Sequence, residues 1–357
     1  MTKMTTLSSD QPDGDGRGDR SRPTMRDVAA LAGVSVKTVS RVINAEPAVS
    51  ADLLARVQRA IDQLDYQPNL TASSLRRGDG KTATVGLVLE DLANPWSAAV
   101  TRAVEDAARP RRVTVVAGSV DEDPERERAL VRAFVARRVD GLIVAPTAVD
   151  QSYLIADRRA GTALVFVDRP PNHLDADAVV AANRTGAADG VRHLLAAGHR
   201  RIAFLGDLAT ISTASNRYAG YLDAVEKAGL AVDESIVRRD LRGGNAARAA
   251  VEELLGLPEP PTAIFAAQNV LGIGAFAGLR GLRRQFEVAL VGFDDFPVAD
   301  LLDPGITVVA QDPGAIGRLA AEMLFRRLDG DRSPSTIEIV PTRLIIRGSG
   351  EIPPPAR

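Results

Sequence analysis

No cysteine occurs in the 357 residues of this chain, which excludes disulfide bonds and thiolate metal sites. Histidine is also scarce, and His173, His193 and His199 are not spaced as metal ligands are. Aromatic residues make up 4% of the chain, and Trp96 is the single tryptophan. No stretch approaches the roughly 18 uncharged apolar residues that a membrane-spanning helix needs. We therefore expect neither a metal centre nor a transmembrane helix.

Residues 1–22 are rich in Ser, Asp and Gly and lack the apolar segment of a secretory signal. We expect them to be a disordered tail of a cytoplasmic protein. The rest can form packed cores, because 45% of the chain is hydrophobic and its length suits two or three domains. Net charge is −2, yet residues 21–77 carry eight Lys or Arg against five acidic residues. This modest local excess of positive charge is weak evidence for a polyanionic partner.

A small helical domain is expected at residues 23–67. Thr24 and Asp27 fit a capping box that starts a short helix, and Gly33 fits the left-handed residue that ends it. Val28 and Leu31 are expected to be the buried residues of this helix.

The second helix is expected to start at Ser35, whose side chain can cap it. One face of this helix is apolar and carries Val39, Val42 and Ile43. The opposite face is polar, with side chains at positions i, i+4 and i+7, namely Lys37, Arg41 and Asn44.

A third helix should begin after Ser50, with apolar residues recurring at spacings of three and four: Leu54, Val57, Ile61 and Leu64. Three short helices with a glycine turn between the first two indicate a helix-turn-helix. The polar face of the second helix would then enter the major groove of DNA. A three-helix bundle with an ordinary solvated face is the alternative.

Residues 68–80 are expected to form a hinge helix and linker. The segment 66–78, YQPNLTASSLRRG, is too short and too poor in helix formers to be stable alone. Two arginines beside it favour folding on a polyanion. Leu75 is suited to wedge between base steps from the minor groove.

The stretches TMRDVAALAGVSVKTVSRVIN and LDYQPNLTASSLR resemble the DNA-binding headpiece and hinge helix of the lactose-repressor (LacI/GalR) family. The resemblance implies base contacts by Val36, Lys37 and Arg41, and backbone contacts by Thr24, Ser35, Thr38, Ser40 and Asn44. It also implies minor-groove contacts by the hinge residues Asn69, Ala72 and Leu75. Val36 could only pack against a group such as a thymine methyl, whereas Lys37 and Arg41 favour guanine acceptors.

Beyond Lys81 the pattern changes to short apolar runs that alternate with helical stretches. The runs lie at 85–91, 113–118, 141–146, 163–168, 201–207, 263–267, 288–295 and 306–312. Such Val/Ile/Leu runs are typical of parallel strands buried on both faces. Because so many units exceed one sheet, we expect a two-lobed α/β domain over 81–347, followed by a tail over 348–357. The N-lobe would comprise about 81–180 and 310–336, and the C-lobe about 183–308 and 337–347.

Polar residues follow the ends of these expected strands: Asp91, Asn94, Asp168, Arg169, Asp207, Asn269, Asp294, Asp295, Gln311 and Asp312. Ligands bind at this edge of open α/β sheets. Carboxylates, amides, an arginine and the indole of Trp96 would suit a ligand with many hydroxyls. The alternative is that some of these residues cap the following helices, which we favour for Asp207 and Asp295.

The resemblance continues through NPW at 94, DRP at 168, GHRRIAFLGD at 198, VGFDDF at 291 and PTRLIIR at 341. These phrases are similar to the family's periplasmic-binding-protein-like effector domain. By position they imply an effector pocket of Trp96, Ser97, Asp168, Arg217, Leu241, Asn269, Asp294 and Gln311. Two departures concern this pocket: Gln-Asn at 268–269 replaces the usual Asn-Asp, and Leu241 replaces a frequent aromatic residue.

The resulting prediction is a sequence-specific transcriptional regulator, a repressor controlled allosterically by a sugar-like effector. The family resemblance implies a homodimer that binds a near-palindromic operator in double-stranded DNA. A cytoplasmic solute-binding protein of the same two-lobed fold is the alternative, but it would leave residues 24–77 unexplained. We expect neither enzymatic activity nor a cofactor, because GIGAFAG at 272–278 has the wrong spacing and context for a dinucleotide loop.

Overall fold

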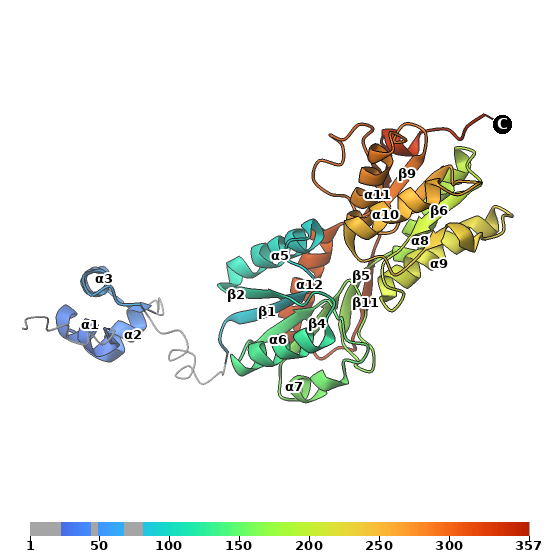
Figure 1. The fold of residues 1–357 in the computed structure, drawn as a ribbon. Coiled ribbons are helices and arrows are strands. Elements are labelled where there is room, and N and C mark those ends of the chain that lie inside the picture. Colours follow the sequence, from blue (N-terminus) through green and yellow to red (C-terminus); the bar gives the residue numbers. More distant parts are fainter. Residues whose placement is uncertain (1–22, 44–48, 68–80, 357) are drawn as a thin grey trace, which may run out of the picture. The chain divides into compact units, whose positions relative to one another are not determined.

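The computed structural model describes residues 23–43, 49–67 and 81–356, which belong to two compact units divided after Gly80 (Figure 1). The first unit holds helices α1 (Met25–Ala32), α2 (Val36–Ile43) and α3 (Ala51–Gln63). None of the helices in these described ranges has the length and apolar character required to cross a bilayer.

The predicted start and end of α1 are confirmed. The hydroxyl of Thr24 accepts the amide N–H of Asp27 at 3.4 Å, and the Asp27 carboxylate accepts the Thr24 N–H at 2.7 Å. Gly33 ends the helix with a φ of 65°, a conformation that other residues adopt at a cost. Arg56 of α3 then donates to the carbonyl of Ala32 at 2.8 Å, which ties the third helix to this turn.

The core of the first unit lies between the three helices and includes Val28, Val39, Val57, Ala60 and Tyr66. The prediction that Leu31 is buried is wrong, because it is 46% exposed; Leu54, one of the regularly spaced apolar residues of the third helix, is 48% exposed. In α1 the small residues Ala29 and Ala32 complete the buried stripe with Val28, which leaves Leu31 on the outer side. In α3 the buried stripe runs through Val57 and Ala60, and Leu54 falls beside it.

The second unit contains two six-stranded sheets, one in each lobe. The N-lobe sheet has the order β11-β5-β4-β3-β1-β2, with β1 (Thr84–Leu89), β2 (Thr114–Ser119), β3 (Gly141–Val144), β4 (Ala163–Val167), β5 (Asp177–Ala181) and β11 (Ile337–Val340). The C-lobe sheet has the order β12-β10-β9-β8-β6-β7, with β6 (Ile202–Leu205), β7 (Val237–Arg238), β8 (Ala263–Ala266), β9 (Ala289–Phe293), β10 (Thr307–Ala310) and β12 (Arg343–Ile345). All strand pairs are parallel except β10 with β12.

Helices cover both faces of each sheet. The N-lobe helices are α5 (Pro95–Ala108), α6 (Pro124–Ala136), α7 (Ile155–Arg159) and α12 (Pro313–Leu328). The C-lobe helices are α8 (Asn183–Ala196), α9 (Ser212–Lys227), α10 (Gly243–Leu255) and α11 (Asn269–Gly281). Short 3₁₀ turns lie at Arg109–Arg111, Ser152–Leu154, Glu234–Ile236 and Gly348–Gly350. The eight predicted strand regions all contain strands, so the predicted two-lobed α/β fold is confirmed.

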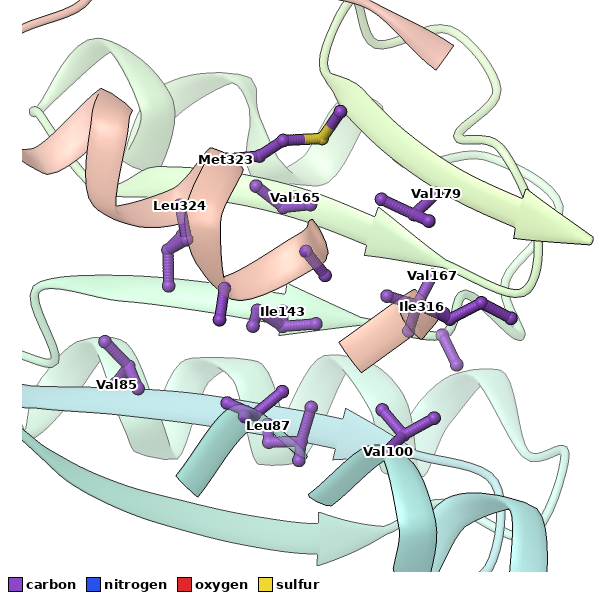
Figure 2. Packing of buried hydrophobic residues seen from close by; sticks show 14 of the residues in the cluster. Val85, Leu87, Val100, Ile143, Val165, Val167, Val179, Ile316, Met323 and Leu324 are labelled. Carbon is purple, nitrogen blue, oxygen red and sulfur yellow. The ribbon is translucent and has the colours of Figure 1, made fainter. Parts of the chain in front are cut away.

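One apolar layer of the N-lobe shows how the sheet and its helices pack together. Figure 2 shows Val85, Leu87, Ile143 and Val165 of the sheet against Val100 of α5 and Leu324 of α12, among others. These side chains are fully or almost fully buried. Burial of each such side chain contributes about 1.5–3 kcal/mol. The layer fixes the sheet, and with it the positions of the loops at its carboxyl edge.

The structure differs from the expected lobe boundaries in two places. Residues 337–340 were expected in the C-lobe, but β11 pairs in register with β5 of the N-lobe sheet. The chain therefore crosses between lobes after β5, after β10 and after β11. The expected tail also begins too early, because Ser349 is buried and its hydroxyl accepts the Thr307 N–H at 2.9 Å.

Candidate functional sites

The surface of α2 carries the side chains that the sequence pattern assigns to DNA. Val39 and Val42 are buried, while Val36 is 37% exposed and Lys37 is exposed. Arg41 is half-buried one turn further along the helix. The N-terminal end of α2 therefore exposes the side chains of Val36 and Lys37 next to each other.

The start of α2 is held by a cap. The Thr38 N–H donates to the Ser35 hydroxyl at 3.1 Å, and the two hydroxyls lie 2.9 Å apart. Ser40 is half-buried on the same helix, and Thr24 is exposed at the start of α1. The predicted contact residues Asn44, Asn69, Ala72 and Leu75 lie outside the described residues.

A cavity of about 50 Å³ lies in the cleft between the two lobes, at the carboxyl edges of both sheets. Six of the eight predicted pocket residues line it: Trp96, Ser97, Asp168, Arg217, Asp294 and Gln311. Residues that follow strands of both lobes therefore form the wall of the cavity. This is the edge of the sheet at which ligands bind in open α/β folds.

Arg217 of α9 lies in this wall, and it is buried. Its guanidinium donates to the side-chain oxygen of Asn183 at 2.7 Å, to the carbonyl of Ala267 at 2.8 Å and to the Asp294 carboxylate at 3.2 Å. The same group lies 3.9 Å from the ring centre of Phe293. These contacts fix the position of the Arg217 guanidinium.

Hydrogen bonds also join the lobes across the cleft. The Trp96 indole N–H donates to the side-chain oxygen of Gln311 at 3.2 Å, and the Gln311 amide donates to Asp294 at 2.6 Å. The Asn269 amide donates to the side-chain oxygen of Asn94 at 3.1 Å. Together they hold α5 of the N-lobe to the C-lobe.

Two predicted pocket residues do not line the cavity. Asn269 is buried and its amide reaches Asn94 instead, because it is the first residue of α11 and faces the opposite lobe. Leu241 packs against the apolar cluster of the C-lobe. Gln268, the residue before α11, lines the cavity in place of Asn269.

Two charged residues of the wall, Glu90 and Glu122, were missed. Arg169 and Asp207 also line the cavity; they were named among the strand-end residues but were not assigned to the predicted effector pocket. Glu90 directly follows β1, and Glu122 lies in the loop after β2, so the rule that ligands bind at strand ends could have found both. Arg169 donates to Glu122 at 2.9 Å and to Asp168 at 3.1 Å.

The preference for capping roles at Asp207 and Asp295 is wrong. Asp207 accepts the N–H of the next residue, Leu208, at 2.7 Å, and the following helix begins only at Ser212. Asp295 forms a two-pronged ion pair with Arg347. Asp207 thus lines the cavity, whereas Asp295 contacts Arg347 just after β12.

Burial in this acidic wall raises the pKa values of several carboxyl groups. The pKa of Glu90 rises to about 7, mainly through burial and then through repulsion by Glu122. Burial likewise raises the pKa of Asp168 and that of Asp207. In the part of the chain that the structure describes, no three acidic or histidine side chains lie close enough to hold a metal ion.

Comparisons with known proteins match both parts of the chain. Residues 24–69 match the model of bacterial regulatory proteins of the lacI family, and residues 191–350 match that of the periplasmic binding protein-like domain. The transcriptional regulator PtxS of Pseudomonas aeruginosa is 35% identical over 92% of this chain and 96% of its own length. The regulator GalR of Escherichia coli is 30% identical over 92% of this chain and 96% of its own.

This chain belongs to the lacI family. Among solved structures, the lac repressor dimer bound to operator and the anti-inducer ONPF has a TM-score of 0.80, with 25% identity over 92% of this chain and 99% of the other. The regulator CelR in complex with cellobiose has a TM-score of 0.68, with 31% identity over 92% of this chain and all of the other.

Membership of the lacI family confirms the predicted DNA-binding transcriptional regulator. It favours this function over the plain solute-binding protein, because the headpiece match covers residues 24–69. The relatives are regulators of transcription and not enzymes.

The raised pKa of Glu90 generates a prediction about this lacI-family regulator. Glu90 in the folded protein holds its proton up to about pH 7, whereas the unfolded chain loses it near pH 4.5. The free energy of unfolding should therefore fall between these pH values, by at most about 3 kcal/mol. Glu90→Gln should remove this dependence, so the variant should be more stable than the wild type at pH 8 and no more stable at pH 4.

Urea unfolding at both pH values measures the difference. Asp91→Asn is the matched control, since Asp91 is exposed and its side chain accepts only the Ala93 N–H. Equal stability of the wild type and Glu90→Gln at pH 8 would contradict the raised pKa.

Proposed function

We propose that this lacI-family regulator is a cytoplasmic repressor whose operator affinity is set by a small sugar-like effector bound between its lobes. One observation carries the proposal: a polar cavity lies where the strand ends of both lobes meet, in a chain whose helix α2 exposes Val36 and Lys37. The complex of the similar regulator CelR with cellobiose supports the proposal.

On DNA, we assign base contacts to Val36, Lys37 and Arg41. We assign contacts with the DNA backbone to Thr24, Ser35, Thr38, Ser40 and Asn44. We assign contacts in the minor groove to Asn69, Ala72 and Leu75. The exposure of Val36 and Lys37 beside the buried Val39 and Val42 supports this assignment for α2.

The effector would act by changing the relative populations of two arrangements of the lobes. A cavity of about 50 Å³ is far smaller than the roughly 300–1,000 Å³ of typical ligand pockets. A sugar can therefore enter only if the lobes separate and the bond between Asn94 and Asn269 breaks. Because ligand binding then favours one lobe arrangement, it can change the affinity for DNA by its differential affinity for the two arrangements.

The C-lobe carries a surface suited to a second copy of this chain. Ile273, Val298 and Leu301 are exposed, and the last is 77% accessible. They lie in or beside an apolar groove that also includes Phe276 and Phe296. A two-fold dimer through this surface would present two headpieces to a near-palindromic operator.

Lys37 provides the test of DNA reading. A duplex selected from a random pool serves as operator, and binding is measured by fluorescence anisotropy at constant salt. Lys37→Ala should weaken operator binding by roughly 5- to 150-fold, the equivalent of about 1–3 kcal/mol, with a much smaller loss on random duplex. Arg59→Ala on the exposed side of α3 is the control. Equal losses on both duplexes would contradict base contact by Lys37.

A ligand panel tests effector binding. Sugars, polyols, amino sugars and phosphosugars are titrated while Trp96 fluorescence and thermal melting are followed. At 100 times its dissociation constant, an effector should add about 2.7 kcal/mol of stability and should also change operator affinity. A ligand that shifts melting while operator affinity stays constant would contradict control of DNA binding.

The dimer surface predicts the effect of a charge at its most exposed residue. Leu301→Asp should raise the dimer dissociation constant at least tenfold in sedimentation experiments, because a buried unpaired carboxylate is strongly unfavourable. Ile339→Asp, at an exposed position of β11 in the other lobe, should leave it unchanged. An unaltered dimer in Leu301→Asp would place the interface elsewhere.

A further inference from the structure

The wall of the cleft cavity carries an excess of negative charge. It contains five carboxylates, Glu90, Glu122, Asp168, Asp207 and Asp294, against two guanidinium groups, Arg169 and Arg217. An uncompensated charge in a partly buried site is unfavourable until an opposite charge joins it. The excess of carboxylates in the wall therefore favours a positively charged ligand.

The two arginines account for three of the carboxylates. Arg169 contacts both Glu122 and Asp168, and Arg217 contacts Asp294. All five of these side chains are at most 15% exposed, so their pairs are well shielded from water. Hydroxyl groups of a neutral ligand could bond to these carboxylates, since each of them already contacts an arginine.

Glu90 and Asp207 remain without an arginine contact. Within the described part of the chain, the Glu90 carboxylate receives no hydrogen bond and forms no ion pair. Asp207 accepts only its neighbouring N–H, and the nearby Arg242 is exposed and does not belong to the cavity wall. Arg169 acts on both carboxylates from a distance, yet it contacts neither and is paired with Glu122 and Asp168. Neutral hydroxyl groups would solvate these two carboxylates but would not balance their charge.

Trp96 adds an aromatic surface to the same wall. Its indole N–H is bonded to Gln311, which fixes the ring, and an indole face attracts ammonium groups more strongly than other aromatic rings do. A bound metal would need several ligands at one point, and no such group exists among the described residues. An organic cation fits this wall better than a metal ion does.

We propose that the effector is a polyhydroxylated compound with a protonated amine, such as an amino sugar or amino polyol, and that Glu90 and Asp207 receive its ammonium group. Ser97, Thr213, Gln268 and Gln311 supply neutral donors and acceptors for the hydroxyls. This inference rests on the proposed function of the cleft as the effector site, and it narrows the ligand class.

The placement of the two carboxylates gives the amine a role in moving the lobes. Glu90 follows β1 of the N-lobe, and Asp207 follows β6 of the C-lobe. When both are ionised they repel each other across the cleft. An ammonium group between them replaces this repulsion by two attractions, so its binding favours the closed arrangement.

Matched ligands test the proposal with the full-length protein. Thermal melting and calorimetry compare N-methylglucamine with sorbitol, and glucosamine with glucose and N-acetylglucosamine. The amines should bind at least tenfold more tightly than their neutral partners. N-methylglucamine should also bind more tightly at pH 8 than at pH 6, because Glu90 must lose its proton while the alkylamine stays charged. Because Glu122, Asp168, Asp207, Asp294, Arg169 and Arg217 also face the cavity, the same pH comparison is made with Glu90→Gln, which retains all of them.

Glu90→Gln should reduce the preference for the amine, because Asp207 alone then faces the ammonium group, and should remove the tighter binding at pH 8. Asp91→Asn, the neighbouring exposed carboxylate, should change neither. Binding of neutral sugars in preference to amines would overturn the inference and leave the proposed function intact. Amine binding that is unchanged in Glu90→Gln would also overturn it. If no member of either set binds, both the inference and the sugar-like effector are contradicted.

Discussion

The buried guanidinium of Arg217 is the interaction on which the effector cleft depends. It joins α9 to Asn183 at the first lobe crossing, to the end of β8 through the Ala267 carbonyl, and to Asp294 at the end of β9. Asp294 in turn accepts from Gln311, at the second crossing, and Gln311 accepts from Trp96 of the N-lobe. The guanidinium of Arg217 thus holds residues at the ends of three strands in place. Two further hydrogen bonds connect it to Trp96 of the N-lobe. Removing one partner would leave buried charge unpaired, which is strongly unfavourable.

Two opposing effects act across the cleft. The bonds from Trp96 to Gln311 and from Asn269 to Asn94 favour closure, whereas the excess of carboxylates over arginines favours separation. Because a hydrogen bond contributes only about 1 kcal/mol net, the two bonds hold the lobes together only weakly. A balance of this kind is what a regulator requires, since a ligand can shift an equilibrium only when both arrangements are within a few kcal/mol.

The sequence was sufficient for the fold and for most of the wall. Continuous apolar runs identified eight strands, and the family resemblance placed Trp96, Asp168, Arg217 and Asp294 at the cleft. Prediction from the sequence failed for residues whose contacts involve partners far away in the chain. The direction of Asn269 depends on Asn94 of the other lobe, and the importance of Glu122 depends on its pairing with Arg169. β11 was assigned to the wrong lobe because Ile337 and Ile339 are exposed on an edge strand, whose short alternating pattern carries no information about its partner.

The absence of cysteine offers a direct test of the claim that lobe arrangement controls DNA binding. Asn94→Cys combined with Asn269→Cys places the only two thiols at side chains that are hydrogen-bonded across the cleft. A short bifunctional thiol reagent then locks the lobes, and operator affinity is measured before and after cross-linking. The account predicts at least a tenfold difference in affinity between the locked and the unlocked protein. Identical affinities would contradict it.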